Sequence, residues 1–388
     1  MRGFAAHRTF ASIFGLSTLL LAGCGGNGAP AASSQPSSSP AAGSVSAAAK
    51  APPSSPATSA AAKPSAPAAT SSIKVGAQEL QTFSGHKNFV TSLVFAPSGG
   101  ALASGSLDQE VKVWDVASGQ ASKTLDQPGQ AVNSLAYTKD GKLLASAGGN
   151  IVMVWDAASG KQAIKPIKAQ TNPTHLAVAF SPDGKTMLVG TRDGLKAYDP
   201  ATGDLGKTTY QGSAGQVESI AFSPDGSLVA SASGTTVDLL DAATGQPKQK
   251  LTGHTKDLLA VAFSPDGKTL ASAGHDGIKL WDVASGKEAK GLVGGASAAA
   301  TSDLLALAQI DTSGVAFSPD GKLLAAGGSS GLRLWEMPSA QPVKAPDTWS
   351  SMPPGGRAGA VNAVGFSPDG KTLASGDNNK MVKLWQIG

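Results

Sequence analysis

The stretch Phe263-Ser-Pro-Asp-Gly-Lys-Thr-Leu-Ala-Ser-Ala-Gly-His-Asp-Gly-Ile-Lys-Leu-Trp-Asp282 decides the fold of this chain. Pro265 presets φ at the second position of a tight turn, and Gly267 tolerates the positive φ that such a turn requires. On either side of a second Asp-Gly turn, apolar and small residues alternate with the period of two that is typical of half-buried strands. The stretch therefore predicts three short antiparallel strands joined by two tight turns.

The same pattern occurs seven times in the chain. Phe-Ser-Pro-Asp-Gly begins at five positions, with degenerate copies at Phe95 and Tyr137; the five are Phe180, Phe222, Phe263, Phe317 and Phe366. The third strand of each copy ends in Trp-Asp or a similar dipeptide, and these dipeptides recur at intervals of 41–54 residues. Their first residues are Trp114, Trp155, Tyr198, Leu240, Trp281, Trp335 and Trp385. Units this small cannot bury both sheet faces alone, so the copies must stack on one another.

Because of these repeated motifs, residues 77–388 resemble the WD-repeat family, whose fold is a β-propeller of four-stranded blades. The resemblance implies an all-β, seven-bladed WD-repeat β-propeller in residues 74–388. The last repeat ends with its third strand at Trp385, whereas Glu79–Phe83 precedes the first repeat at the position of a fourth strand. Pairing these two ends would remove two open sheet edges, so we expect Glu79–Phe83 to close the ring.

The resemblance also implies a buried tetrad of His, Ser or Thr, Asp and Trp in each blade. Two repeats carry the tetrad complete: His86, Ser104, Asp108 and Trp114 in the first, and His254, Ser272, Asp276 and Trp281 in the fifth. Elsewhere the tetrad is degraded, with Asn150 and Asn379 replacing Asp, Val189 replacing Ser and Leu240 replacing Trp. We expect repeats 3 and 4 to depend more on apolar packing than on this polar network.

Residues 1–23 have the features of a secretory signal peptide: a short basic beginning, an apolar run from Phe10 to Ala22 and small residues before a break. The apolar run is shorter than the roughly 20 residues needed to span a bilayer. Leu21-Ala22-Gly23-Cys24 resembles a bacterial lipobox, which implies acylation of Cys24 with palmitate or a similar chain and anchoring in the lipid bilayer. The alternative is an ordinary signal peptide with an incidental cysteine nearby.

Residues 24–73 consist almost entirely of Ala, Ser, Pro and Gly and contain no acidic residue. Such a segment cannot bury enough apolar surface to offset its loss of conformational entropy, so we predict a disordered Ala/Ser/Pro tether. Gly25 follows the cysteine, which by resemblance to Gram-negative lipoproteins favours the periplasmic face of the outer membrane. In a host with one membrane, the expected location is the outer face of the cytoplasmic membrane.

The basic isoelectric point of the chain comes from its N-terminal segments. Of 31 Lys and Arg residues, Arg2, Arg8, Lys50 and Lys63 precede residue 74, and the remaining 27 equal the 27 Asp and Glu residues of the rest of the chain. A neutral domain directed out of the cytoplasm is a poor candidate for binding nucleic acid. We therefore expect no nucleic acid among its partners.

Motifs of catalysis are missing from the sequence, which contains no Gly-x-Ser-x-Gly, Walker or His-Glu-x-x-His pattern. The single cysteine excludes a Cys-based zinc site. We expect no catalytic residue, no metal and no cofactor. His175 occupies a position that is mostly apolar in the other repeats, near the upper end of the channel, where it could bind a ligand or simply pack.

Two insertions precede repeats 6 and 7, in residues 291–310 and 344–359, on what the family geometry makes one rim. The second insertion contains Trp349, Met352 and Arg357, residue types that are enriched at interfaces. Trp349 could contact a partner or plug the channel mouth. On the same face, turn residues Arg192 and His275 are expected to project upward, which makes these residues, with His175, a candidate partner-binding rim.

These observations favour a membrane-anchored, non-catalytic scaffold that binds a protein or peptide partner in the bacterial cell envelope. The alternative is a small-molecule sensor or enzyme that uses the propeller channel near His175. The sequence does not identify the partner.

Overall fold

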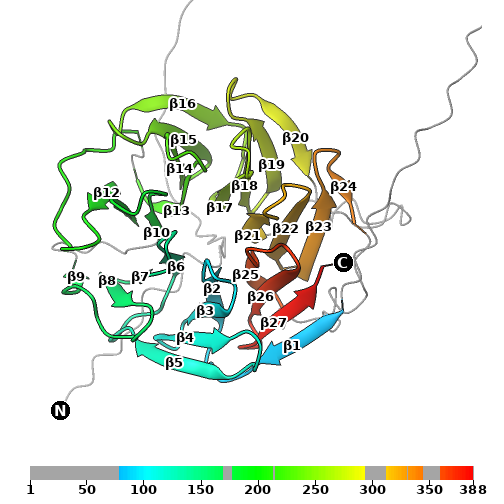
Figure 1. Cartoon of the computed structure of the whole chain (residues 1–388). Helices are drawn as coiled ribbons and strands as arrows, with labels where there is room; N and C mark the ends of the chain where they lie inside the picture. Colours follow the sequence, from blue (N-terminus) through cyan, green and yellow to red (C-terminus); the bar gives the residue numbers. More distant parts are fainter. Residues whose placement is uncertain are drawn as a thin grey trace, which may run out of the picture. The chain divides into compact units, whose positions relative to one another are not determined.

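The structure, a computed structural model, describes residues 78–168, 177–212, 215–292, 312–329, 331–343 and 359–387. These residues form 27 β-strands in seven antiparallel sheets arranged as the blades of a propeller (Figure 1), which confirms the predicted fold class. No segment in these ranges forms a helix long and apolar enough to cross a membrane.

Each blade begins with a strand next to the central channel and continues outward. The innermost strands are β2 (Val90–Phe95), β6 (Ser134–Tyr137), β10 (Ala177–Phe180), β13 (Val217–Phe222), β17 (Leu258–Phe263), β21 (Thr312–Phe317) and β25 (Val361–Phe366). The second strands are β3 (Ala101–Ser106), β7 (Leu143–Gly148), β11 (Met187–Thr191), β14 (Leu228–Ser233), β18 (Thr269–Gly274), β22 (Leu323–Gly328) and β26 (Thr372–Asp377).

The third and outermost strands complete the blades. The third strands are β4 (Glu110–Asp115), β8 (Ile151–Asp156), β12 (Gly194–Tyr198), β15 (Thr236–Asp241), β19 (Gly277–Asp282), β23 (Gly331–Glu336) and β27 (Val382–Gln386). The outermost strands are β5 (Ala121–Asp126), β9 (Ile167–Lys168), β16 (Pro247–Thr252), β20 (Glu288–Leu292), β24 (Gln341–Pro342) and β1 (Glu79–Phe83). We call the face with the Pro-Asp-Gly turns the lower face, and the face with the turns between second and third strands the upper face.

The tight turns on the lower face have the conformation that their sequence predicts. In blade 5 the Oγ of Ser264 donates to Asp266 at 2.6 Å and accepts from the backbone N–H of Thr269 at 2.9 Å, while Gly267 has a φ of 71°. Asp266 also accepts from the backbone N–H of Lys268 at 3.0 Å. The aspartate is therefore used within its own turn, as Asp side chains commonly are, and its repetition needs no bound ion.

The ring is closed by the two ends of the folded region, as expected from the sequence. Strand β1 pairs antiparallel with β27, with Phe83 opposite Val382 and Thr82 opposite Lys383. The Nζ of Lys383 also forms an ion pair of 2.9 Å with Glu79. From this strand Phe83 reaches into the next blade, where its ring stacks on Trp114 with 5.3 Å between centroids. Blade 7 is thus joined to blade 1 by both a sheet ladder and an apolar contact.

Neighbouring blades contact one another through their inner strands around the whole ring, including β25 against β2. Apolar clusters fill the spaces between adjacent sheets, as in the cluster of blades 7 and 1 that contains Phe83, Trp114 and Leu384. Among the described residues, hydrogen bonds from a backbone N–H to a serine Oγ of the preceding blade also join neighbouring blades: Leu135 to Ser92 at 3.0 Å, Val178 to Ser134 at 3.2 Å and Val261 to Ser219 at 3.2 Å.

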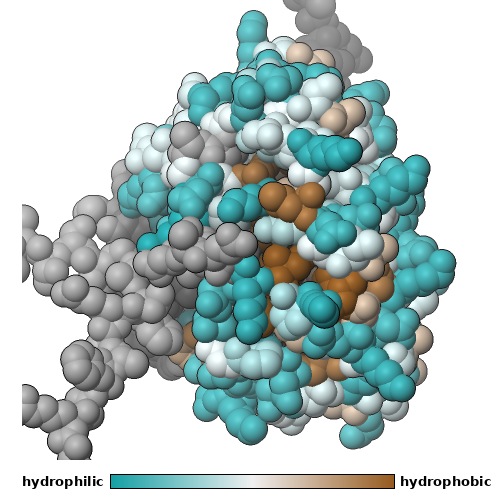
Figure 2. Space-filling view, turned by 90° about the vertical axis from the view of Figure 1, so that its left-hand side faces the viewer, coloured by the Kyte–Doolittle hydropathy of each residue, from teal (hydrophilic) through white to brown (hydrophobic). Residues whose placement is uncertain are grey.

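Blade 3 departs from the four-stranded pattern that the family resemblance implies. In the described residues its sheet contains only β10, β11 and β12, and Leu205 makes a single bridge with Tyr198. The following segment is held by blade 4 instead, because the hydroxyl of Tyr210 donates to the carbonyl of Ala242 at 2.6 Å and the N–H of Gln211 donates to Gly245 at 2.9 Å. The side of the molecule that carries β9 and β12 shows hydrophobic side chains among hydrophilic ones (Figure 2).

Closure predicts that Phe83 contributes far more to stability than its neighbour Leu80. Phe83 is 1% exposed, so Phe83→Ala should lower the free energy of unfolding by about 3–5 kcal/mol, as is usual for a buried Phe. Leu80 is 51% exposed, and Leu80→Ala serves as the matched control with an expected change below about 0.5 kcal/mol. Deletion of residues 74–83 should destabilise the domain at least as much as Phe83→Ala. Thermal or urea unfolding that is unchanged by this deletion would contradict closure by β1.

Candidate functional site

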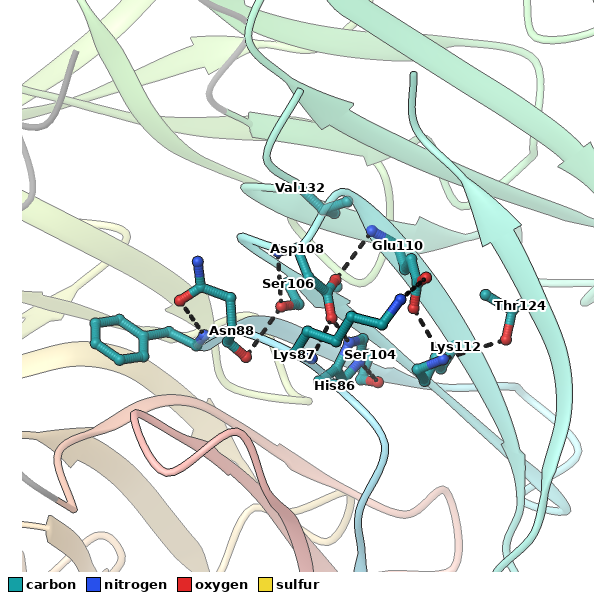
Figure 3. A network of polar contacts seen from close by, with 12 residues as sticks. His86, Lys87, Asn88, Ser104, Ser106, Asp108, Glu110, Lys112, Thr124 and Val132 are labelled. Carbon is teal, nitrogen blue, oxygen red and sulfur yellow. Dashed lines mark hydrogen bonds and ion pairs between the residues drawn. The ribbon is translucent and has the colours of Figure 1, made fainter. Parts of the chain in front are cut away.

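The tetrad of blade 1 forms a continuous chain of hydrogen bonds that joins the segment before β2, strand β3, the turn after β3 and strand β4. Figure 3 shows the part of it that His86, Ser104 and Asp108 form. The indole N–H of Trp114 donates to the Oγ of Ser104 at 2.8 Å, and the same oxygen lies 2.7 Å from the Nε2 of His86. On its other side the Nδ1 of His86 lies 2.9 Å from Asp108. Because an ionised carboxylate can only accept, a neutral His86 carries its proton on Nδ1 and donates it to Asp108. Its Nε2 then accepts from the hydroxyl of Ser104, and the oxygen of that hydroxyl accepts from the indole.

Burial sets the charge state of this tetrad. Desolvation lowers the pKa of His86 below its usual value and outweighs the opposing effect of the Asp108 carboxylate. For Asp108, desolvation raises the pKa, but the hydrogen bonds from the backbone N–H of Lys87 and from His86 outweigh it, so the net pKa is lowered. The network therefore holds a neutral imidazole beside an ionised carboxylate at neutral pH.

Blade 5 repeats this arrangement. The Nε1 of Trp281 donates to Ser272 at 2.7 Å, Ser272 lies 2.7 Å from the Nε2 of His254, and Nδ1 of this histidine lies 2.5 Å from Asp276. Asp276 also accepts from the backbone N–H of Thr255 at 2.6 Å, which ties the segment before the first strand to the turn between second and third strands. The structure thus brings together both complete sets of tetrad residues found in the sequence.

In blade 2 a glutamine takes the place of the tetrad histidine. The sequence alone did not indicate this replacement. Gln127 is fully buried, its Oε1 accepts from the Oγ of Ser146, and its Nε2 donates to the carbonyl of Ile151 at 3.3 Å. The residue aligned with His86 is Pro128, and Gln127 lies one position earlier. The sequence does show a polar residue, Gln127, next to the position where a histidine is expected. Only the path of the backbone shows that its side chain reaches Ser146, the serine that corresponds to Ser104 of blade 1.

One group near the first tetrad has the composition of a metal site. Donor atoms of His86, Asp108 and Glu110 lie within 4.8 Å of one another. However, His86 and Asp108 are bonded to each other, while Glu110 forms ion pairs with Lys112 at 2.9 Å and Lys87 at 3.3 Å. The ammonium groups of Lys87 and Lys112 around the Glu110 carboxylate oppose a cation, so this arrangement fits a structural network better than a metal centre.

Two residues of the expected rim lie in equivalent turns of the upper face. Arg192 is exposed between β11 and β12, and His275 is half-buried between β18 and β19. Both act on Glu218 of β13, whose pKa is raised mainly by burial and further by Asp257, while Arg192 and His275 lower it. The half-buried Glu218 thus lies in blade 4, between the blades that carry the two expected residues, and sequence reasoning missed it.

The other expected functional residues lie outside the described residues. These are the acylation candidate Cys24, the channel candidate His175 and the rim residues Trp349, Met352 and Arg357.

The repeats place the chain in a known family. The profile of the WD domain, G-beta repeat family matches more than half of the chain, at residues 77–115, 119–156, 206–239, 245–282, 310–336 and 353–386. The chain therefore belongs to the WD domain, G-beta repeat family. The six matches leave out residues 157–205, which include all three strands of blade 3, so the blade that departs in structure also departs in sequence.

Individual relatives are eukaryotic. The chain is 31% identical over 157 residues to the WD repeat-containing protein SL1-17 of Schistosoma mansoni, which covers 40% of this chain and 50% of the relative. It is 34% identical over 161 residues to the WD repeat-containing protein VIP3 of Arabidopsis thaliana, covering 37% and 49%. It is also 29% identical over 186 residues to THO complex subunit 3 of the same plant, covering 45% and 56%. The chain thus spans about half the length of these relatives.

The tetrad geometry predicts a large cost for removing its central hydroxyl. Ser104→Ala leaves the indole N–H of Trp114 and the Nε2 of His86 buried without their partner, which should destabilise the domain by about 2–4 kcal/mol. Ser122→Ala on the exposed outer strand β5 is the matched control, with an expected change within about 0.5 kcal/mol. Urea denaturation monitored by tryptophan fluorescence measures both. Equal stability of the two variants would show that the tetrad contributes little.

Proposed function

We propose that this protein is a membrane-anchored WD-repeat lipoprotein that acts as a non-catalytic protein–protein interaction scaffold in the bacterial cell envelope. The observation that carries the proposal is the closed seven-bladed ring of a family whose propellers generally serve as scaffolds for protein assembly. Blades held together by interior packing leave the turns of both faces free to vary without loss of the fold.

The partner-binding surface that we propose is the upper rim. Arg192 and His275 supply charged or titratable groups there, and Glu218, on which both act, lies in the blade between theirs. Equal numbers of acidic and basic side chains from residue 74 onward favour a protein partner over nucleic acid. The name of one relative, THO complex subunit 3, likewise describes a component of a protein assembly.

The location that we propose rests on the N-terminal sequence alone. A signal-like segment, residues 1–23, is followed by the Ala/Ser/Pro-rich residues 24–73, which begin with Cys24, the only cysteine of the chain. Acylation of Cys24 would anchor the protein in the bilayer, because two or more acyl chains give lasting attachment. The protein is then attached to the periplasmic side of the outer membrane or, in a host with one membrane, to the outer side of the cytoplasmic membrane.

The anchor is tested by replacing the acylated residue. Cys24→Ser should move the protein from the membrane fraction to the soluble fraction and abolish incorporation of radiolabelled palmitate. Ser34→Ala in the following segment is the control and should leave both unchanged. Membrane attachment that persists in Cys24→Ser would contradict the lipoprotein assignment.

The rim is tested by crosslinking in intact membranes. Three single variants are compared: Arg192→Ala, Trp349→Ala and Arg357→Ala. A variant that removes an interface anchor should reduce crosslinking to the protein partner by about tenfold, because that is the usual effect of losing one strong contact. Lys322→Ala, in a lower-face turn, is the matched control and should retain full crosslinking. Unchanged partner recovery in all three rim variants would place the binding surface elsewhere.

A further inference from the structure

Six of the seven lower-face turns between first and second strands carry a proline, and each of these prolines touches the turn of the next blade. At six junctions the proline of one turn packs against the glycine of the turn in the next blade, and a Cβ placed on that glycine would lie 3.4–3.7 Å from the proline Cδ. The six pairs are Pro97 with Gly141, Pro182 with Gly226, Pro224 with Gly267, Pro265 with Gly321, Pro319 with Gly370 and Pro368 with Gly99.

This series of proline contacts is interrupted at the junction of blades 2 and 3. Lys139 occupies the proline position of the blade 2 turn. Apart from the glycine and its two chain neighbours, no atom of the residues that the structure describes lies within 4 Å of a Cβ placed on Gly184 of blade 3. The turn itself is otherwise ordinary, because the N–H of Gly141 donates to Thr138 at 2.8 Å and the N–H of Lys142 donates to Asp140 at 3.1 Å, as in the five Pro-Asp-Gly turns. The gap therefore results from a missing proline ring and not from a displaced backbone.

A groove opens at this gap. It has a volume of about 610 Å³, within the range of peptide and small-ligand sites, and its walls combine apolar and charged side chains, among them Lys139, Leu143, Ile164, Pro182, Gly184 and Pro200. A second groove of about 480 Å³ lies on the other side of the blade 3 turn and includes Tyr210, Phe222 and Pro224. Lys139, Pro182 and Asp183 line both, so the two grooves meet at the interruption.

The charge of these grooves is acidic. Four aspartates line them, and hydrogen bonds from neighbouring groups hold the pKa of each below its usual value, so all four are ionised at neutral pH: Asp140, Asp156, Asp183 and Asp225. Among the residues that line the grooves only Lys139 and Lys142 are basic, and Lys142 forms an ion pair of 3.0 Å with Asp140. Outside the lining, Lys185 lies 4.0 Å from Asp183, and Lys123 acts on Asp156. The excess of aspartates over lysines in the lining itself favours a basic occupant over a phosphate group or an acidic peptide.

We propose that the lower-face groove between blades 2 and 3 binds an extended basic peptide segment of a partner protein, with a proline of that segment packed against Gly184. The six intact junctions supply the reason for proline, because at each of them a proline ring fills this same space beside a turn glycine. A lysine or arginine of the peptide lies against the aspartates of the groove walls. Extended proline-containing segments suit such a groove because they lose little conformational freedom on binding. The site is on the face opposite the proposed upper rim and does not depend on it.

Closing the gap is the direct test. The full-length protein carrying Cys24→Ser is titrated with a fluorescent twelve-residue peptide of alanine, two adjacent prolines and three lysines, and binding is followed by anisotropy. Lys139→Pro supplies the missing ring, and binding should weaken by about tenfold or more because the occupant is displaced. The melting temperature of this variant should equal or exceed that of the parent, since six equivalent turns already carry proline. Unchanged affinity in a folded Lys139→Pro variant would overturn the proposal.

Matched variants separate the groove from general surface charge. Asp183→Asn should weaken binding by about threefold to tenfold, whereas Asp266→Asn, at the same position of the blade 5 turn, should leave the affinity unchanged. A peptide with both prolines replaced by alanine should bind about tenfold more weakly. If the alanine peptide binds equally well, or if both Asp variants lose the same affinity, the attraction is electrostatic only and the proline site does not exist.

Discussion

A single blade of this protein cannot bury either face of its sheet, so every blade is stable only between two neighbours. This constraint makes closure of the ring the interaction on which the structure depends, because an open arc would leave two sheets with one uncovered face each. The ring is closed by the pairing of β1 with β27 and by the packing of Phe83 against Trp114 of the next blade. Contacts between inner strands then continue around the ring without a break.

The polar tetrads reinforce individual blades within that ring. Complete networks occur in blades 1 and 5, and Gln127 replaces the histidine in blade 2. In blade 7 the N–H of Trp385 still donates to Ser375 at 2.9 Å. In blade 4 the Trp position is taken by Leu240, which packs with Leu188, Val217 and Tyr210 at the junction with blade 3. A buried polar network is stabilising when all its members are satisfied, so a blade can keep the network or replace it with apolar packing.

Blade 3 differs from the other six blades on several counts. It falls outside the segments matched by the family profile, it lacks an outermost strand in the described residues, and its lower-face turn faces the one interrupted proline–glycine contact. The two grooves lie on either side of that turn. A blade held by its neighbours can tolerate such changes, which is how a closed ring allows a distinctive surface to arise at one position.

Local chemistry determined much of this protein directly from the sequence. The turns at Pro265 and Gly267, the number of blades and the closing role of Glu79–Phe83 could be predicted because each depends on residues close together or on the two ends of a repeat pattern. The use of Gln127 as a histidine substitute, the surroundings of Glu218 and the gap beside Gly184 were decided only by the tertiary structure. Each of these three depends on how segments from different strands or blades approach one another, and that approach is set by packing around the ring and not by the local sequence.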